Sequence, residues 1–176
     1  AREATEHLVG MGHTRIAFLG DLTDIATASN RYEGYRDALE DAGIRLDQRL
    51  VRTDLHNRDT AQRAAESLLR LPEDEAPTAL FASQNLITIG AIQALHLHDL
   101  QRLIALVGFD DIELAGMLDP GVTVVAQDPY AIGRAAAEQL FARLDGYRGP
   151  SQHRTISTRL IIRGSGEIRP REEAAA

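Results

Sequence analysis

Polar side chains follow four apolar runs of this sequence, at the point where each run ends. Asp110 and Asp111 come directly after the run that ends at Phe109, and the other three runs are followed by Asp21, by Asp54 and by Ser83-Gln84-Asn85. Ligands of open α/β sheets bind at the carboxyl ends of parallel strands. The pattern therefore predicts a site that holds a polar small molecule.

Arg31 is the cation that could complete this site. It begins a predicted amphipathic helix, after a loop over residues 21–30 that is rich in small and hydroxyl side chains. A guanidinium can bind two neighbouring hydroxyls or a carboxylate through paired hydrogen bonds. The spacing fits equally well a surface ion pair between Arg31 and Glu33 or Asp37.

Other polar residues could share such a ligand. Asp110 can accept hydrogen bonds from hydroxyl groups, and Gln84 and Asn85 can both donate and accept. We expect Asp110 to face the site and Asp111 to cap the helical turn that follows. This set of residues favours a neutral, hydroxyl-rich ligand.

The motifs of common enzymes are missing. Gly10-Met11-Gly12 follows a predicted helix and lacks a third glycine, so it does not match the dinucleotide fingerprint, and no Gly-x-Ser-x-Gly elbow is present. Two histidines, His96 and His98, are spaced so that a helix points them in different directions. Asp54, His56 and Asp59 could in principle form a hard-metal site, and His13 fits a turn better than a catalytic base. We expect a binding protein, not an enzyme, with no cofactor and no metal.

Composition narrows the class further. The chain has 176 residues, a formal charge of −7, no cysteine and 5% aromatic residues. The negative charge argues against nucleic-acid binding by this chain alone, because phosphate binding requires a concentrated basic surface. No apolar run approaches the roughly 18–20 residues that span a bilayer.

Helical and strand-like segments alternate along the chain. The predicted helices cover residues 1–11, 31–42, 59–71, 86–98 and 129–144, and the predicted strands cover 15–20, 50–53, 78–82, 103–109, 122–126 and 155–162. Strands separated by helices of this length indicate βαβ units and a mainly parallel sheet. We therefore predict an α/β, Rossmann-like sheet with helices on both faces.

Six sequence motifs in one order resemble the effector-binding core of LacI-type bacterial transcription regulators, over residues 1 to about 166. They are GHTRIAFLG at residues 12–20, RYEGY at 31–35, LVGFDD at 106–111, Asp119-Pro120, VTVVAQ at 122–127 running on to GRAA at 133–136, and LIIRGS at 160–165. The resemblance implies a periplasmic-binding-protein-like fold of type I, of which this chain holds mostly the C-terminal lobe. It also implies that most of the N-terminal lobe and a helix-turn-helix domain lie outside these residues.

The resemblance implies the following division of the chain. Residues 13–126 would form the C-terminal lobe and 149–166 a strand that returns to it, while 1–12 and 127–148 would be helices of the N-terminal lobe and 167–176 a tail. Those two helices should expose apolar faces or find another partner.

Several site residues carry over by position. Arg31 matches the family arginine that binds effector hydroxyls, and Asp110 matches its acidic partner. Thr27 falls on a loop position that contacts ligand, and Gln127 lies at the crossover between lobes. The chain departs from the family at Ser83-Gln84-Asn85, where an amide replaces a carboxylate, and at Leu55, where many members place an aromatic.

The resemblance implies a cytoplasmic sensor of a small molecule, often a sugar, that controls DNA binding by allostery through the helix-turn-helix domain. It implies a homodimer with contacts from two segments, whose residues are Ile89, Gln93, Leu97, Ile112, Leu114 and Leu118. Packing within one chain is the alternative for the second segment, residues 112–118. The rival functions are a periplasmic sugar-binding protein of an uptake system and, more distantly, a flavodoxin-like or hydrolase-type enzyme.

Overall fold

The computed structural model describes residues 1–150 and 152–171, and its centre is a six-stranded sheet. The strands are β1 (Ile16–Leu19), β2 (Val51–Arg52), β3 (Ala79–Ala82), β4 (Ala105–Phe109), β5 (Thr123–Ala126) and β6 (Arg159–Ile161), arranged in the order β2-β1-β3-β4-β5-β6. All neighbouring pairs from β2 to β5 are parallel, and only β6 runs antiparallel to its neighbour. The predicted mainly parallel α/β sheet is confirmed.

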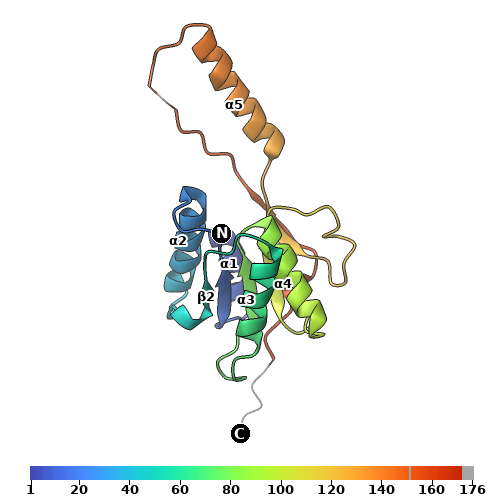
Figure 1. Cartoon of the computed structure of the whole chain (residues 1–176). Helices are drawn as coiled ribbons and strands as arrows, with labels where there is room; N and C mark the ends of the chain where they lie inside the picture. The colour runs from blue at the N-terminus through green and yellow to red at the C-terminus, as the bar shows by residue number, and fades with distance from the viewer. Residues whose placement is uncertain (151, 172–176) are drawn as a thin grey trace.

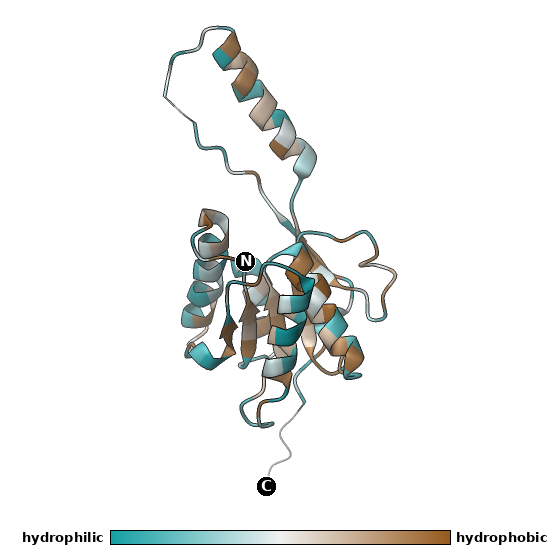
Figure 2. Cartoon of the chain, viewed as in Figure 1, coloured by the Kyte–Doolittle hydropathy of each residue, from teal (hydrophilic) through white to brown (hydrophobic). Residues whose placement is uncertain are grey.

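Helices cover both faces of this sheet (Figure 1). Helices α1 (Arg2–Gly10) and α2 (Ala26–Asp41) lie on one face, and α3 (Arg58–Leu69) and α4 (Asn85–Leu97) lie on the other. Neighbouring strand residues point to opposite faces, because side chains alternate along a strand. In β4, Leu106 packs toward α3 and α4 while Val107 packs toward α1 and α2. The central strands are therefore apolar throughout, as Figure 2 shows by their brown colour.

Helix α1 packs on the described sheet. The resemblance assigns residues 1–12 to the N-terminal lobe. In the described structure the side chains of Ala4 and Leu8 are fully buried in the same cluster as Phe18 and Tyr35. The helix lies beside α2, and it has therefore found a partner within this chain.

Helix α5 (Pro129–Leu144) behaves differently. It projects away from the sheet between β5 and β6 (Figure 1), and none of its residues is buried. Its bounds match the predicted range of residues 129–144. Pro129 occupies its first turn, and the Asp128 side chain accepts a hydrogen bond from the N–H of Ala131. Its exposed large apolar residues are Tyr130, Ile132, Leu140, Phe141 and Leu144.

Three predicted elements differ clearly in extent. One is the strand expected over residues 155–162, of which only Arg159–Ile161 is a strand. Helix α2 begins at Ala26 and not at Arg31, so the second half of the expected loop, residues 26–30, is helical. The strand expected over residues 50–53 is reduced to Val51–Arg52, and a short 3-10 helix, Gln48–Leu50, precedes it. A second 3-10 helix, Ser165–Glu167, follows β6. Residues 172–176 of the predicted tail lie outside the described residues.

Candidate ligand-binding site

The carboxyl ends of the central strands bring the predicted polar residues to one edge of the sheet. The register pairs Leu19 with Ala82 and Ala82 with Gly108, so β1, β3 and β4 end side by side. The segments that follow remain tied to the sheet: the N–H of Ser83 donates to Leu19 O at 2.9 Å, and that of Asp110 donates to Val125 O at 2.9 Å. Asp21, Ser83 and Asp110 therefore follow neighbouring strands at the same edge.

Arg31 is held at this edge by two contacts. Its Nη1 donates to the backbone O of Ser83 at 2.8 Å, and its Cζ lies 4.1 Å from the centre of the Phe109 ring, in cation–π geometry. Among the described residues it forms no ion pair with Glu33 or Asp37, and Asp37 pairs with Arg36 instead. The alternative of a surface ion pair is therefore not formed.

The electrostatics of Arg31 follow from this position. Burial lowers the pKa of the guanidinium, and the nearby charges of Asp110 and Asp21 act in the opposite direction. Neither carboxylate forms an ion pair with Arg31 in the described part of the chain. The two carboxylates are thus near enough to act on Arg31 electrostatically without pairing with it, and the three groups could share the hydroxyl groups of one ligand.

Asp110 is also positioned by specific contacts. Its backbone has a positive φ of 66°, a turn conformation in which Asp is among the better tolerated residues. Its Oδ1 accepts a hydrogen bond from Gln127 Nε2 at 2.5 Å. Gln127 follows β5 and precedes α5, so the predicted acidic residue touches the predicted crossover residue.

Asp111 has a different main partner from the one expected. Its carboxylate interacts with the backbone of Ile112, in line with the expected capping role, but its two oxygens accept mainly from Nη1 and Nη2 of Arg163, each at 2.7 Å. These hydrogen bonds lower the pKa of Asp111 below its usual range. Arg163 follows the edge strand β6, so the ion pair connects the loop after β4 to the segment after β6.

The remaining predicted site residues have different structural positions: Thr27 is exposed, Gln84 and Asn85 lie at the start of α4, and Leu55 is buried in the core. Thr27 is exposed in the first turn of α2. Gln84 caps α4, because its Oε1 accepts from the N–H groups of Leu86 and Ile87, and exposed Asn85 also accepts from Leu86. Leu55 lies in the hydrophobic core, with 7% of its surface exposed.

Leu55 is buried because of the backbone path around it. Asp54 has a φ of 61°, and the N–H of Leu55 donates to Gly20 O at 3.1 Å, which turns the side chain under the edge toward the core. This placement leaves little of Leu55 for contact with a ligand.

Two groups near Arg31 were not predicted. Phe109 and the carbonyl of Ser83 hold the guanidinium, and the Ser83 hydroxyl is buried with no hydrogen-bond partner among the described residues. The alternation of β4 places Phe109 on the α2 side, with Val107, and this periodicity could have indicated the ring. A backbone carbonyl carries no sequence signal.

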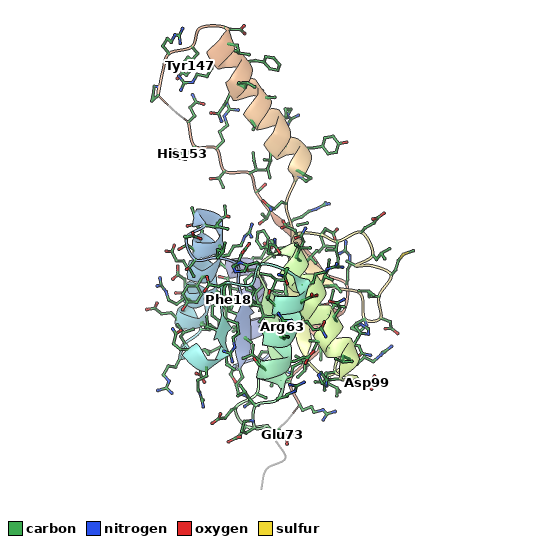
Figure 3. All side chains as sticks on the ribbon, in the orientation of Figure 1. Phe18, Arg63, Glu73, Asp99, Tyr147 and His153 are labelled. Carbon is green, nitrogen blue, oxygen red and sulfur yellow. The ribbon has the colours of Figure 1, made fainter. Side chains whose placement is uncertain are left out.

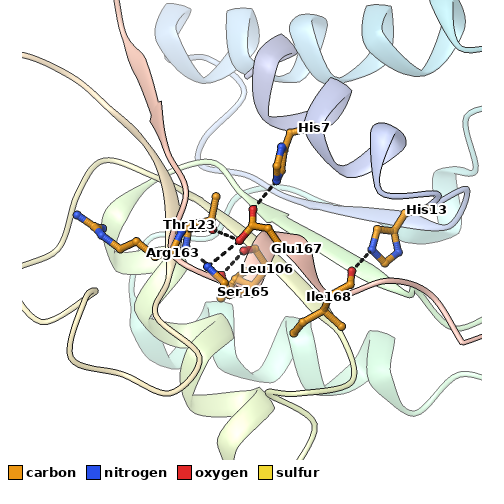
Figure 4. Close-up of polar contacts among 9 residues, drawn as sticks. His7, His13, Leu106, Thr123, Arg163, Ser165, Glu167 and Ile168 are labelled. Carbon is orange, nitrogen blue, oxygen red and sulfur yellow. Dashed lines mark hydrogen bonds and ion pairs between the residues drawn. The ribbon is translucent and has the colours of Figure 1, made fainter.

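Two histidines near the N-terminus, His7 and His13, contact residues near the C-terminal end of the described chain (Figure 4). Buried His13 directly follows the turn that ends α1, and its ring bridges Thr78 Oγ1 and Ile168 O, at 2.8 Å each. His7 pairs with Glu167 at 2.6 Å. No three potential metal-binding side chains gather anywhere in residues 1–150 and 152–171, so Asp54, His56 and Asp59 do not form the site considered for them.

The residues predicted for a dimer lie on α4 and on the loop after β4. Gln93 is exposed, and Leu97 and Leu114 expose 63% and 58% of their surface. The other three, Ile89, Ile112 and Leu118, are half-buried.

Comparison with known proteins decides the family. A family model described as the periplasmic binding protein-like domain matches residues 5–166. The chain belongs to this family. Within it, the matched proteins identify the chain as the effector-binding part of LacI-type transcriptional regulators.

Two curated relatives illustrate the match. The chain is 31% identical to the transcriptional repressor CytR of Escherichia coli, over 97% of this chain and 50% of that protein, and 33% identical to the ribose operon repressor of the same species, over 92% and 49%. The chain thus spans about half the length of the curated relatives it matches.

Solved structures agree with the fold. A LacI-family regulatory protein from Chloroflexus aggregans superposes with a TM-score of 0.85 at 31% identity, covering 93% of this chain and 59% of that one. The regulator CelR in complex with cellobiose superposes with a TM-score of 0.84 at 32% identity, covering 93% and 50%. None of the helices in the described residues is long and apolar enough to cross a membrane.

Proposed function

We propose that this chain is the effector-sensing part of a LacI-type transcriptional regulator, with a sugar or polyol as its effector. The observation that carries the proposal is the placement of Arg31, held between Ser83 O and the Phe109 ring, with the charge of Asp110 acting on it. A guanidinium and a carboxylate in this arrangement can bind neighbouring hydroxyls from two sides. The cellobiose complex of a relative supports a carbohydrate.

The effector would act on DNA binding through a helix-turn-helix domain outside these residues, as the names of the HTH-type relatives suggest. Such control is linkage: a ligand shifts the equilibrium only by its different affinity for two states, typically about 1–3 kcal/mol. The hydrogen bond between Asp110 and Gln127 offers a route, because Gln127 leads directly into α5. A ligand that engages Asp110 would change this contact.

We propose that the regulator acts as a cytoplasmic homodimer. Leu97 on α4 and Leu114 in the loop after β4 expose much of their apolar surface, and Met117 of the same loop is 84% exposed. Exposed apolar groups of this kind often mark contact surfaces. Sedimentation equilibrium of the chain would test the assembly.

The matched relatives are regulators, which favours this function over a periplasmic uptake protein or an enzyme.

A thermal-shift screen against sugars, polyols and nucleosides tests the effector site. A ligand at about 100 times its Kd stabilises the folded chain by about 2.7 kcal/mol, which for a chain of this size raises Tm by about 5–10 °C. We expect Arg31→Ala to abolish the shift while the circular dichroism spectrum stays that of the unmodified chain.

Arg63→Ala is the matched control. Arg63 is exposed on α3 (Figure 3) and forms no hydrogen bond or ion pair within the described residues. It should leave the shift unchanged. An undiminished shift in Arg31→Ala would contradict the assignment of the site.

A further inference from the structure

The charge at the candidate site is negative. Asp21 and Asp110 are the two carboxylates whose charges act on Arg31. Asp110 uses Oδ1 to accept from Gln127, and Asp21 uses Oδ1 to accept from the N–H of Leu22. In each, the second oxygen has no hydrogen-bond partner among the described residues. These three groups together carry one positive and two negative charges.

Two further arginines near this edge act on Asp111. Exposed Arg159 pairs with Ala126 in the register of β5 and β6, and its charge helps to lower the pKa of Asp111. Arg163 is bound through both terminal nitrogens to Asp111. The sequence contains no lysine, the compact cation that often binds phosphate.

The helix ends at this edge are also poorly suited to an anion. Phosphates commonly bind free N–H groups at helix N-termini. The start of α3 is capped by the Asn57 side chain and that of α4 by Gln84. The start of α2 has no side-chain cap, but the segment that leads into it carries Asp21 and Asp24. Negative side chains therefore occupy the approach to the one uncapped start among these three helices.

We propose that this site selects an uncharged or positively charged polyhydroxylated effector and rejects phosphorylated sugars. The inference rests on the proposed function and narrows its ligand class. Like charges brought together in a binding site are strongly unfavourable, so Asp21 and Asp110 would repel a phosphate group while they accept hydrogen bonds from hydroxyls. The guanidinium of Arg31, already hydrogen-bonded to Ser83 O, would not outweigh both.

Matched ligand pairs that differ by a phosphate test this proposal on the 176-residue chain. The pairs are D-ribose with D-ribose 5-phosphate, D-glucose with D-glucose 6-phosphate, cellobiose with its 6-phosphate, and uridine with uridine 5′-monophosphate; D-glucosamine and inorganic phosphate are added. Affinities are measured by calorimetry at about pH 8.5, where phosphate monoesters are dianions. In every pair with measurable binding, we expect the phosphorylated member to bind at least about tenfold more weakly, and we expect no binding of inorganic phosphate.

Charge-removing variants assign the effect to the two carboxylates. Asp21→Asn keeps the size of the side chain and removes one negative charge. The affinity of the unphosphorylated member of a pair divided by that of the phosphorylated member should then fall at least about threefold. Asp74→Asn is the control, because Asp74 is exposed in the turn between α3 and β3, away from the site, and should leave the ratio unchanged.

The outcomes separate the two hypotheses. Equal or tighter binding of a phosphorylated member, or a ratio that Asp21→Asn and Asp74→Asn leave alike, would overturn the proposed charge selection while the effector site stands. If none of the unphosphorylated compounds binds, D-glucosamine included, the proposed function is overturned, and this inference with it.

Discussion

Two regions of the molecule contain helices but hold them differently. We call the sheet with α1 to α4 the body, and we call residues 127–150 and 152–158, which include α5, the arm. Helices α1 to α4 each bury side chains against the sheet, whereas α5 buries none. Both α3 and α5 are capped by a polar side chain at the N-terminus. The local sequence therefore defines where a helix begins and ends, while burial determines how strongly it is held, since propensity alone leaves helices of this length marginal.

The largest expected contrast concerns one phenylalanine in each region. Phe81 in β3 is fully buried, so Phe81→Ala should cost about 3–5 kcal/mol of unfolding free energy. Phe141 in α5 is 62% exposed, and Phe141→Ala should change this free energy by less than about 0.5 kcal/mol. Urea unfolding followed by circular dichroism measures both. Similar losses in the two variants would mean that α5 is packed in solution and that the contrast is mistaken.

A smaller effect is expected from His13 in the body. Burial lowers its pKa below the ordinary value of 6.5, so the unfolded chain takes up a proton more readily than the folded one. The stability that neutral His13 contributes is complete above about pH 6.5, and it is lost as the pH falls from there toward the folded pKa. Urea midpoints between pH 7.5 and 5 should decline, and the decline should be shallower in His13→Gln.

His56→Gln provides the comparison, because exposed His56 shows no hydrogen bond within the described residues. Its midpoints should decline as steeply as those of the unmodified chain. A decline equally steep in His13→Gln would exclude His13 as the cause.

The smallest effect on global stability is expected for the cap of α5. Asp128→Ala removes the acceptor for the N–H of Ala131 and should weaken α5 by about 1 kcal/mol. Hydrogen exchange should then quicken at α5 amides and nowhere in the body, with an unchanged urea midpoint. The same change in the body, Asn57→Ala at the start of α3, should instead lower the midpoint. A lowered midpoint in Asp128→Ala would show that the arm unfolds together with the body.

Much of this arrangement could be predicted from the sequence, because periodicity and caps are local signals. The predicted helix over residues 129–144 matches α5, and apolar runs indicated the strands that bring Asp21 and Asp110 to one edge. The start of α2 was missed because its N-cap, Ile25, has no capping side chain.

Contacts between distant segments could not be predicted in the same way. The burial of Leu55 depends on how the backbone turns at Asp54, and the support of Arg31 by Ser83 depends on a backbone carbonyl. The packing of α1 on the sheet depends on which apolar surface is nearest in the folded chain, and periodicity does not specify that surface. Roles for Thr27, Gln84 and Asn85 in ligand binding stay predictions.

The stacking of Arg31 on Phe109 has a further consequence for affinity. A free arginine side chain samples many rotamers, and fixing it when a ligand binds costs about 0.5–1.5 kcal/mol of conformational entropy. Here the ring and the Ser83 carbonyl already restrict the side chain before any ligand arrives. Most of that entropy is lost during folding, so a ligand that meets this guanidinium would gain up to about tenfold in affinity over one that must immobilise a mobile arginine.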